Sequence, residues 1–256
     1  MMDTQIIHQL NQINQKFYKK TAQDFSNSRA YYWHGWREIL PYLENLLGEK
    51  DQLKVLDVGC GNGRFGLFLA DNLPSITINY HGTDSNTKLL EIAKEQLKKT
   101  ELEASFSQSD IVEELIDGTF FSQDTAQYDI IVMFGVLHHI PTYQFRKKII
   151  QTLGNKLTKS GIFVFTLWRF IDDNQLEKKQ VAYEKGDISE EQLDKNDYLI
   201  SWQRETKSFR YCHYTDELEE QRLVAASELE LLSAFESDGR EGKGNKYLVL
   251  TQPSGV

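Results

Sequence analysis

Between residues 54 and 168 the chain alternates between two patterns of hydrophobic and polar positions. Short apolar runs, rich in β-branched residues and stopped by Gly, Asp or other polar residues, predict strands. Between them, apolar residues recur every three or four positions, as on the buried face of an amphipathic helix. The predicted strands are Lys54–Gly59, Ile76–Asp84, Ala104–Asp110, Tyr128–Leu137 and Gly161–Trp168, and the predicted helices are Gly63–Leu73, Thr87–Lys99 and Thr142–Leu157. This alternation predicts an α/β fold: one parallel, Rossmann-like sheet with helices on both faces.

The flanking segments follow other patterns. Residues 1–50 carry apolar residues at helical spacing and predict a helical N-terminal cap. Residues 171–227 begin with a charged stretch poor in large apolar groups, followed by two short strands and a helix, and we interpret them as an insertion on the substrate side. Two alternating segments around a glycine-rich turn predict a C-terminal antiparallel hairpin over 228–252. Because no Pro- or Ser-rich linker interrupts the sequence, we expect 1–256 to form a single domain with 54–168 as its core.

Composition and charge narrow the class of protein. The chain is 40% hydrophobic and 12% aromatic, which is enough for a sizeable core and argues against disorder. No apolar run approaches the roughly 18 residues of a membrane helix, and the N-terminus lacks the pattern of a signal peptide. With only two cysteines we expect no disulfide framework and a cytoplasmic location. The net charge of −9 counts against a nucleic-acid partner without excluding a local basic site.

The sharpest local feature is a loop at the end of the first predicted strand, in which glycines alternate with other residues. Alternate glycines let the backbone turn tightly and approach a ligand closely, and the helix N–H groups that follow favour a polar or anionic group. A dinucleotide fingerprint is matched only formally, and the carboxylate inside the strand end would repel a pyrophosphate. The loop residues predicted to bind a ligand are Asp57, Gly59, Cys60, Gly61, Asn62 and Gly63.

Acidic residues end the next two predicted strands. Asp84 follows Gly63 by 21 residues, and a carboxylate there can accept both hydroxyls of a ribose; Ser85 comes next. Asp110 and Ile111 end the third strand, where an acid can accept an adenine amino group while an apolar side chain covers the ring. Each acid alone is more often a helix cap or a loop residue. Three together at one edge of a parallel sheet predict a nucleoside-containing ligand.

The chain leaving the fourth predicted strand contains Phe134, His138 and His139. One histidine can simply cap the following turn. The alternative use of the pair is as hydrogen-bond donors or as a base at a reaction centre. Two histidines so close could bind zinc, but the sequence offers no convincing third and fourth ligands, so we expect no metal.

The glycine loop and the three acids resemble the class I S-adenosylmethionine (SAM)-dependent methyltransferases over about residues 50–252. The resemblance implies SAM as cofactor, with the glycine loop under its methionine part, Asp84 at the ribose and Asp110 at the adenine. It places Ser85, Ile111 and Phe134 beside the cofactor. A non-catalytic scaffold of the same fold is a weaker interpretation, because a scaffold has no need of three aligned acids. A nicotinamide dehydrogenase is weaker still, because the dinucleotide fingerprint is matched only formally.

Four segments resemble one subfamily more closely, the tRNA wobble-uridine carboxymethyl methyltransferases, which occur in eukaryotes alone or fused to an AlkB-type hydroxylase. These segments are Phe17–Trp33, Asp57–Arg64, Val136–Lys148 and Asp197–Glu220. The resemblance implies esterification of a carboxymethyl group, with tRNA and a small zinc-binding activator subunit as partners. Arg29, Arg210 and His213 match its motifs, whereas His34 and Cys212 depart from them and leave the acceptor open.

The acceptor must then be held by a hydrogen-bond donor. Because a carboxylate is already anionic, positioning matters more than a strong base. The candidates for catalysis are His138, His139, Arg210 and His213, and Arg29 is assigned either to the acceptor or to the methionine carboxylate of the cofactor. Four basic groups are candidates for contacting RNA: Arg146-Lys147-Lys148, Lys156 with Lys159, Arg204 with Lys207 and Arg210, and Arg240 with Lys243 and Lys246. A small-molecule methyltransferase, with residues 1–50 and 171–227 as a lid, remains the alternative.

Overall fold

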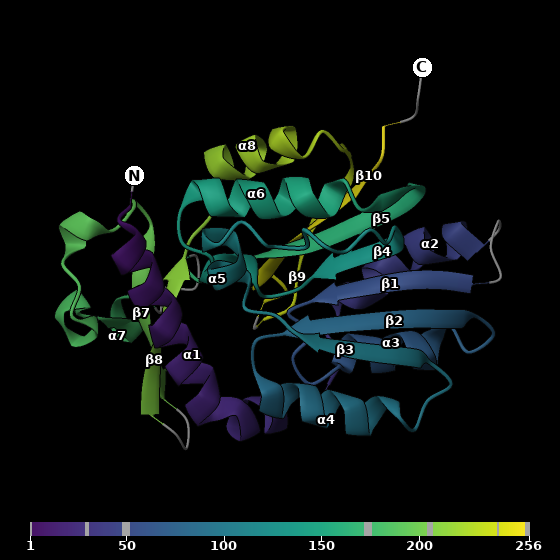
Figure 1. Cartoon of the computed structure of the whole chain (residues 1–256), viewed down its shortest axis with the longest axis horizontal. Coiled ribbons are helices and arrows are strands. Elements are labelled where there is room, and N and C mark those ends of the chain that lie inside the picture. Colours follow the sequence, from purple (N-terminus) through teal and green to yellow (C-terminus); the bar gives the residue numbers. More distant parts are fainter. Residues whose placement is uncertain are drawn as a thin grey trace.

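The computed structural model describes residues 2–28, 31–47, 52–171, 176–203, 207–239 and 241–253. Its centre is a seven-stranded sheet in the order β3-β2-β1-β4-β5-β10-β9 (Figure 1). The strands are β1 (Gln52–Val58), β2 (Thr77–Asp84), β3 (Glu103–Gln108), β4 (Tyr128–Met133), β5 (Leu157–Trp168), β9 (Glu230–Ser237) and β10 (Asn245–Thr251). Strands β1 to β5 pair in parallel, and β10 is antiparallel to both β5 and β9. The predicted parallel α/β sheet and its C-terminal antiparallel pair are therefore confirmed.

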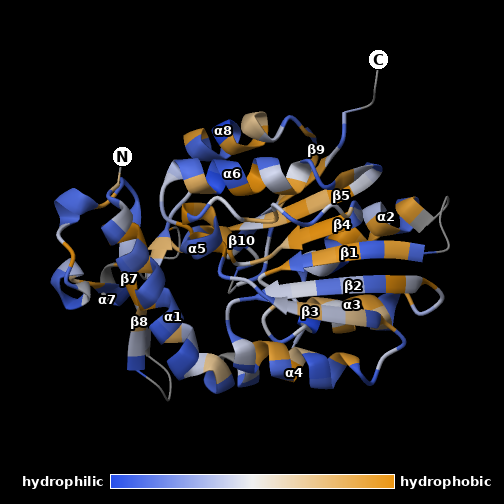
Figure 2. Cartoon of the chain, viewed as in Figure 1, coloured by the Kyte–Doolittle hydropathy of each residue, from blue (hydrophilic) through white to orange (hydrophobic). Residues whose placement is uncertain are grey.

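Helices cover both faces of this sheet, as predicted. On one face α5 (Ile111–Ile116), α6 (Tyr143–Gly154) and α8 (Glu217–Ser227) contribute to one apolar cluster. On the other face α2 (Gly35–Leu47), α3 (Arg64–Asn72) and α4 (Thr87–Leu97) contribute to a second cluster. All six residues of β4 are buried, which explains why its sequence is almost entirely apolar. Figure 2 shows the same arrangement, with hydrophobic strands inside and hydrophilic residues along the helices.

The remaining elements gather beyond the carboxyl ends of the parallel strands (Figure 1). A second, three-stranded sheet is built from β6 (Gln180–Val181), β7 (Asp197–Gln203) and β8 (Lys207–His213), next to α7 (Leu176–Lys179). The long helix α1 (Thr4–Asn27) packs against β8 and also contacts α4 and α5. We call α1 together with β6–β8 the cap. The N-terminal helix and a segment inserted between β5 and α8 therefore cover the edge where the predicted site residues lie.

Some predicted boundaries differ from the structure. The fourth strand ends at Met133, four residues early, because Gly135 takes a φ of +71° and a 3₁₀ turn, η1 (Leu137–His139), follows. The short helix α5 was not predicted, and Asp110 caps its start instead of ending β3. The charged insertion also contains the 3₁₀ turns η2 (Tyr183–Gly186) and η3 (Glu190–Gln192). No helix in the described ranges is long and apolar enough to span a membrane.

Candidate functional site

The loop between β1 and α3 has the backbone that its alternating glycines predict. Gly59, Gly61 and Gly63 have φ values of +74°, +54° and +78°. A Cβ on Gly59 would lie 2.2 Å from Cγ2 of Val136, and one on Gly63 would lie 2.9 Å from Cβ of Ala93. Among the described residues, no atom lies within 4 Å of a Cβ on Gly61. The loop is thus packed down at its two ends and open at its centre, where a ligand can lie against the backbone.

Asp84 lies at the end of β2, beside this loop. Its Oδ2 accepts a hydrogen bond from the backbone N–H of Gly61 at 2.9 Å, and its Oδ1 accepts one from Asn86 at 2.8 Å. Burial raises the pKa of the Asp84 carboxyl, and these two hydrogen bonds partly oppose the shift. Each carboxylate oxygen can accept more than one hydrogen bond, so the group can still receive the hydroxyls of a ribose.

Asp110 has a structural role as well as a place in the site. Its Oδ1 accepts from the backbone of Glu113 at 3.2 Å, which caps α5. Two side chains of α1 also donate to it: Nδ2 of Asn11 at 3.0 Å and Nε2 of Gln15. The alternative of a helix cap is therefore realised, while Asp110 and Ile111 still line a cavity.

Two cavities meet at the carboxyl edge of the sheet. The smaller, about 140 Å³, lies between α1 and the ends of β2 and β3, and its lining includes Asp84, Ser85, Asp110, Ile111 and His139. The larger, about 470 Å³, has a largely aromatic wall and includes Asp57, Cys60, Asn62, Arg64, His138 and Arg210. Five residues line both cavities: Tyr18, Gly59, Gly61, Phe134 and Gly135. Gly63, at the start of α3, lines neither.

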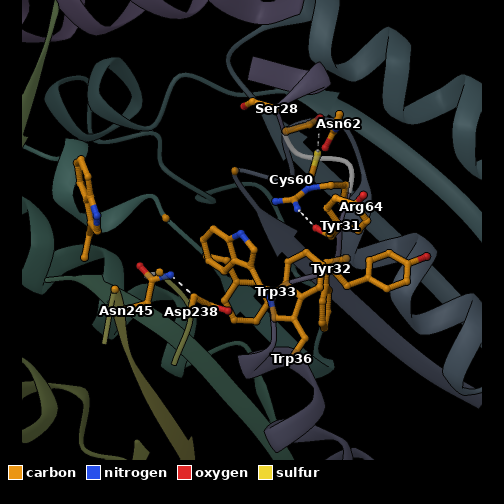
Figure 3. A pocket seen from close by; sticks show the side chains of 18 of the residues that line it. Ser28, Tyr31, Tyr32, Trp33, Trp36, Cys60, Asn62, Arg64, Asp238 and Asn245 are labelled. Atoms are coloured by element: carbon orange, nitrogen blue, oxygen red, sulfur yellow. Dashed lines mark hydrogen bonds between the residues drawn. The ribbon is translucent and has the colours of Figure 1, made fainter. Parts of the chain in front are cut away.

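Figure 3 shows the larger cavity from close by. The rings of Tyr32, Trp33 and Trp36 lie together, and the guanidinium of Arg64 donates to the backbone carbonyl of Tyr31 at 2.5 Å. The guanidinium carbon of Arg64 also lies 5.2 Å from the ring centroid of Trp36. The cavity therefore offers stacking surfaces beside a few fixed polar groups.

Asp57 is one of two acidic residues in the lining of the larger cavity, with Asp238. It is 3% exposed, and its Oδ2 accepts a hydrogen bond from the phenol of Tyr80 at 2.6 Å. Burial raises the pKa of Asp57 to about 7, against the lowering effect of the Tyr80 hydrogen bond. Near neutral pH this carboxyl is therefore close to the midpoint of its titration, and a positively charged group of a ligand would favour its ionised form.

Arg210 is the buried cation of the same cavity. It is 7% exposed, and its guanidinium carbon lies 4.8 Å from the ring centroid of Trp168 and 5.1 Å from that of Phe17. The ring of Trp202 lies at 5.8 Å. Among the described residues no carboxylate forms an ion pair with Arg210. A buried guanidinium of this kind is suited to receive an anionic group from a ligand.

The two histidines after β4 line different cavities. His138 lines the larger one and packs on Trp168, with ring centroids 5.0 Å apart. His139 lies 3.0 Å from the carbonyl oxygen of Tyr211 through Nδ1, and 2.7 Å from the hydroxyl of Tyr18 through Nε2. Because a carbonyl can only accept, we assign the ring hydrogen to Nδ1, and Nε2 then accepts from Tyr18. Burial, and next the charge of Arg210, lower the pKa of His139 to about 3, so the ring is neutral near pH 7.

Cys212 lies close to both histidines, with one candidate ligand atom from each of the three residues within 4.8 Å of the others. The structure thus supplies a third candidate metal ligand that the sequence did not suggest. However, both ring nitrogens of His139 already have hydrogen-bond partners, and burial raises the pKa of the Cys212 thiol to about 12. The cluster is built as a hydrogen-bonded group, and the absence of a metal remains a prediction.

The structure does not bring His213 to either cavity. Its Nδ1 lies 2.7 Å from Asp197 and its Nε2 lies 2.9 Å from Glu219, and the side chain is 2% exposed. His213 and Arg210 are three residues apart on β8, so they point to opposite faces of the strand. Because side chains alternate between the two faces of a strand, the sequence could have predicted that Arg210 and His213 lie on different faces of β8. Arg29 lies outside the described residues.

Several of the predicted RNA-contacting residues have internal partners. Arg146 is buried and donates to Glu219 at 2.6 Å, Lys156 lies 3.5 Å from Asp124, and Lys246 lies 2.5 Å from Glu220. Arg204 and Arg240 lie outside the described residues. These pairs correct the interpretation of Arg146, Lys156 and Lys246 as solvent-facing phosphate contacts.

A polar stripe on α1 belongs to the site and was missed by sequence reasoning. Asn11, Asn14, Gln15 and Tyr18 recur at helical spacing, and all four line the smaller cavity. Asn14 accepts from the backbone N–H of Tyr211 at 2.8 Å, which ties the helix to β8. The signal was available, because polar residues at i, i+3, i+4 and i+7 share one face of a helix.

Comparison with known proteins supplies the family. A family model described as a methyltransferase domain matches residues 49–217, which is more than half of the chain. The chain belongs to the methyltransferase domain family. The matched domain is that of a SAM-dependent methyltransferase, as the resemblance of the glycine loop and the acids predicted.

The relatives of this methyltransferase differ in what they act on. It is 26% identical to "Probable tRNA methyltransferase 9B" of Bos taurus over 171 residues, covering 67% of this chain and 31% of that protein. The human protein of the same name is 24% identical over 187 residues, covering 73% and 32%. "Ubiquinone biosynthesis O-methyltransferase" of Leptothrix cholodnii is 30% identical over 128 residues, covering 49% and 48%. The chain therefore spans about a third of the length of the tRNA methyltransferase 9B proteins.

Solved structures agree on the fold. A SAM-dependent methyltransferase from Clostridium acetobutylicum superimposes with a TM-score of 0.63 at 14% identity, covering 93% of this chain and 98% of the other. The PH0226 protein from Pyrococcus horikoshii gives a TM-score of 0.59 at 16% identity, with coverage of 93% and 98%. At these identities the likeness concerns the fold.

The residues of the site fit the SAM that the family uses. The smaller cavity has Asp84 for a ribose and the apolar Ile111 for an adenine face. Gly61 lines both cavities, and in the larger one the carboxyl of Asp57 is suited to the positively charged amino group of the methionine part. We therefore assign the nucleoside half to the smaller cavity and the methionine half to the larger one, with the sulfonium where the two meet.

Proposed function

We propose that this methyltransferase esterifies a carboxylate, and that its acceptor is the carboxymethyl group of a wobble uridine in tRNA. The observation that carries the proposal is Arg210, a buried cation that lines the larger cavity without an ion pair to any described carboxylate. The guanidinium of Arg210 has aromatic rings as neighbours, and a carboxylate acceptor would give it an anionic partner that a neutral acceptor could not.

The residues of the cavity then act by positioning. Bound SAM supplies an electrophilic methyl group on a sulfonium. Arg210 holds the acceptor carboxylate, which carries its own negative charge and so needs no base. One carboxylate oxygen forms the new C–O bond as the C–S bond breaks, and both charges are neutralised. The aromatic walls exclude water, which favours this loss of charge, and orientation alone can supply on the order of 7–11 kcal/mol.

Two further observations support tRNA as the source of the carboxylate. The tRNA methyltransferase 9B relatives match over 67% and 73% of this chain. Trp168 and Trp202 lie beside Arg210, so a base carrying the carboxylate has rings on which to stack. We include a small zinc-binding activator subunit in this proposal, as the subfamily resemblance implies.

A small-molecule carboxylic acid is the second candidate. The internal ion pairs of Arg146, Lys156 and Lys246 favour it, because they reduce the positive charge available for a phosphate backbone. The ubiquinone biosynthesis relative matches about half of the chain and shows that small-molecule enzymes are also among its relatives.

The proposal is tested by transfer of labelled methyl from SAM into total tRNA from cells that lack wobble-uridine esterification. The tRNA is digested to nucleosides and analysed by mass, with and without mild base treatment. A labelled wobble-uridine ester that disappears in mild base is the expected result. Label in a base ring or a ribose would contradict the carboxylate chemistry. No label in tRNA, with SAM binding intact and activator subunit added, would favour the small-molecule acid.

A further inference from the structure

The junction of the two cavities has one polar side chain among the described residues. Of the five residues that line both cavities, three are glycines and one is Phe134, which leaves Tyr18. The nucleoside half of SAM belongs on one side of this junction and the methionine half on the other. The sulfonium and its methyl group therefore come to the place where Tyr18 lies.

The hydroxyl of Tyr18 has a defined direction. It donates to Nε2 of His139 at 2.7 Å, and the two rings meet edge to face with centroids 5.4 Å apart. His139 is itself fixed by the carbonyl oxygen of Tyr211, 3.0 Å from Nδ1. Asn14, one turn before Tyr18 on α1, accepts from the N–H of Tyr211 at 2.8 Å and so holds α1 and β8 together. With its proton committed to His139, the phenol oxygen can act towards the junction only as an acceptor.

We propose that the phenol oxygen of Tyr18 contacts the sulfonium methyl group of SAM, and that His139 is a positioning residue that acts through Tyr18. The hydrogens of a sulfonium methyl carry partial positive charge, so an oxygen lone pair attracts them in C–H···O contacts. If His139 acted through Nε2 as a base or as a metal ligand, its hydrogen bond with Tyr18 would be lost. This inference rests on the use of SAM alone and is independent of the acceptor.

The contact is tested by the affinities for SAM and for S-adenosylhomocysteine (SAH), which lacks the methyl group. Calorimetry on Tyr18→Phe should show an affinity for SAM lowered about two- to fivefold, with the affinity for SAH unchanged. Tyr183→Phe is the matched control, because it loses a phenolic hydrogen bond of 2.9 Å in the cap but lines neither cavity. An equal loss for both ligands in Tyr18→Phe would overturn the methyl contact.

Two amide variants test the part played by His139. Glutamine can place an oxygen near the position of Nε2 and keep the acceptor for Tyr18, whereas asparagine can keep only the donor towards Tyr211. We expect His139→Gln to retain the wild-type ratio of SAM to SAH affinity, and His139→Asn to show the ratio of Tyr18→Phe. The double variant Tyr18→Phe/His139→Asn should then show no further change in the ratio.

A wild-type ratio in His139→Asn would overturn the positioning role of His139. Thermal unfolding of each variant separates this result from loss of the fold. Because no acceptor is present in these measurements, their outcome is distinct from that of the tRNA labelling experiment.

Discussion

One carboxylate oxygen of Asp84 lies 2.9 Å from the backbone nitrogen of Gly61, so the end of β2 is tied to the glycine loop after β1. The other oxygen receives the N–H of Asn86 at 2.8 Å. The acid assigned to the ribose therefore also holds the open centre of the loop in place. Loss of its carboxylate would remove a ligand contact and a loop contact at once.

Asp84→Ala should accordingly weaken SAM binding roughly ten- to a hundredfold, because the hydrogen bonds from the ribose to a charged carboxylate are lost. Calorimetry measures this change, and circular dichroism checks that the fold is retained. Asp84→Asn is the matched variant, because it keeps one acceptor oxygen and should bind with intermediate affinity. Unchanged affinity in Asp84→Ala would remove Asp84 from the ribose site.

Two glycines of the same loop should respond differently to alanine. In Gly59→Ala the new Cβ would lie 2.2 Å from Val136, so we expect a clear loss of thermal stability. In Gly61→Ala the Cβ would meet no atom of the described part of the chain within 4 Å, so the fold should tolerate it apart from about 1 kcal/mol of backbone strain. That Cβ would instead occupy space assigned to SAM, and calorimetry should show weaker binding. Wild-type affinity in a folded Gly61→Ala protein would contradict the assigned path of the cofactor.

Asp57 should make the stability of the unliganded protein depend on pH. Burial raises its pKa from 3.8 to about 7, so the folded state holds the proton more tightly than the unfolded state. This contribution to stability is fully present below about pH 4 and is lost as the pH rises through about 7. Urea unfolding of wild type and Asp57→Asn should therefore diverge over this range, with the wild type falling relative to the variant by a few kcal/mol. If the free energies of unfolding of the two proteins change in parallel with pH, the pKa of the Asp57 carboxyl is not raised in the folded state.

Arg210→Ala should separate acceptor use from cofactor binding. Loss of the cation should lower kcat/KM for the acceptor roughly ten- to a hundredfold, because a charge-assisted pair is lost, while SAM affinity stays near wild type. Arg210→Lys keeps the positive charge but lacks the planar guanidinium, so its kcat/KM should lie between those of the wild type and Arg210→Ala. Arg222→Ala, on the exposed face of α8, is the control for removal of an arginine. Equal losses of acceptor use and SAM binding would assign Arg210 to the cofactor or to the fold.

His213 should matter for stability and not for SAM binding. It bonds Asp197 and Glu219 inside the protein, and although burial alone would raise the pKa of Glu219, His213 and Arg146 lower it to about 2. His213→Asn should lower the free energy of unfolding by about 3 kcal/mol, because buried carboxylates lose a partner. Denaturant unfolding measures this loss. A fall in methyl transfer without a fall in stability would return His213 to the reaction centre.

The core of the fold was predictable because its determinants are local. The apolar run of β4, the helical spacing in α4 and the glycines after β1 each reflect a backbone geometry set by a few neighbouring residues. The helix α5 escaped prediction because it has only six residues, too few for a periodic pattern, and its cap Asp110 also suited a ligand site.

By itself the sequence determined the parallel sheet, the glycine loop and the acids at one edge, because parallel strands bring their carboxyl ends together whatever else surrounds them. Only the tertiary structure decided which polar residues reach that edge from the cap. Arg210 meets Phe17 and Tyr18 meets His139 across large separations in sequence, through the docking of α1 on β8. Arg210 and His213 share a sequence motif but have different roles. The pleat of β8 places Arg210 at the cavity and His213 beside Asp197 and Glu219 inside the protein.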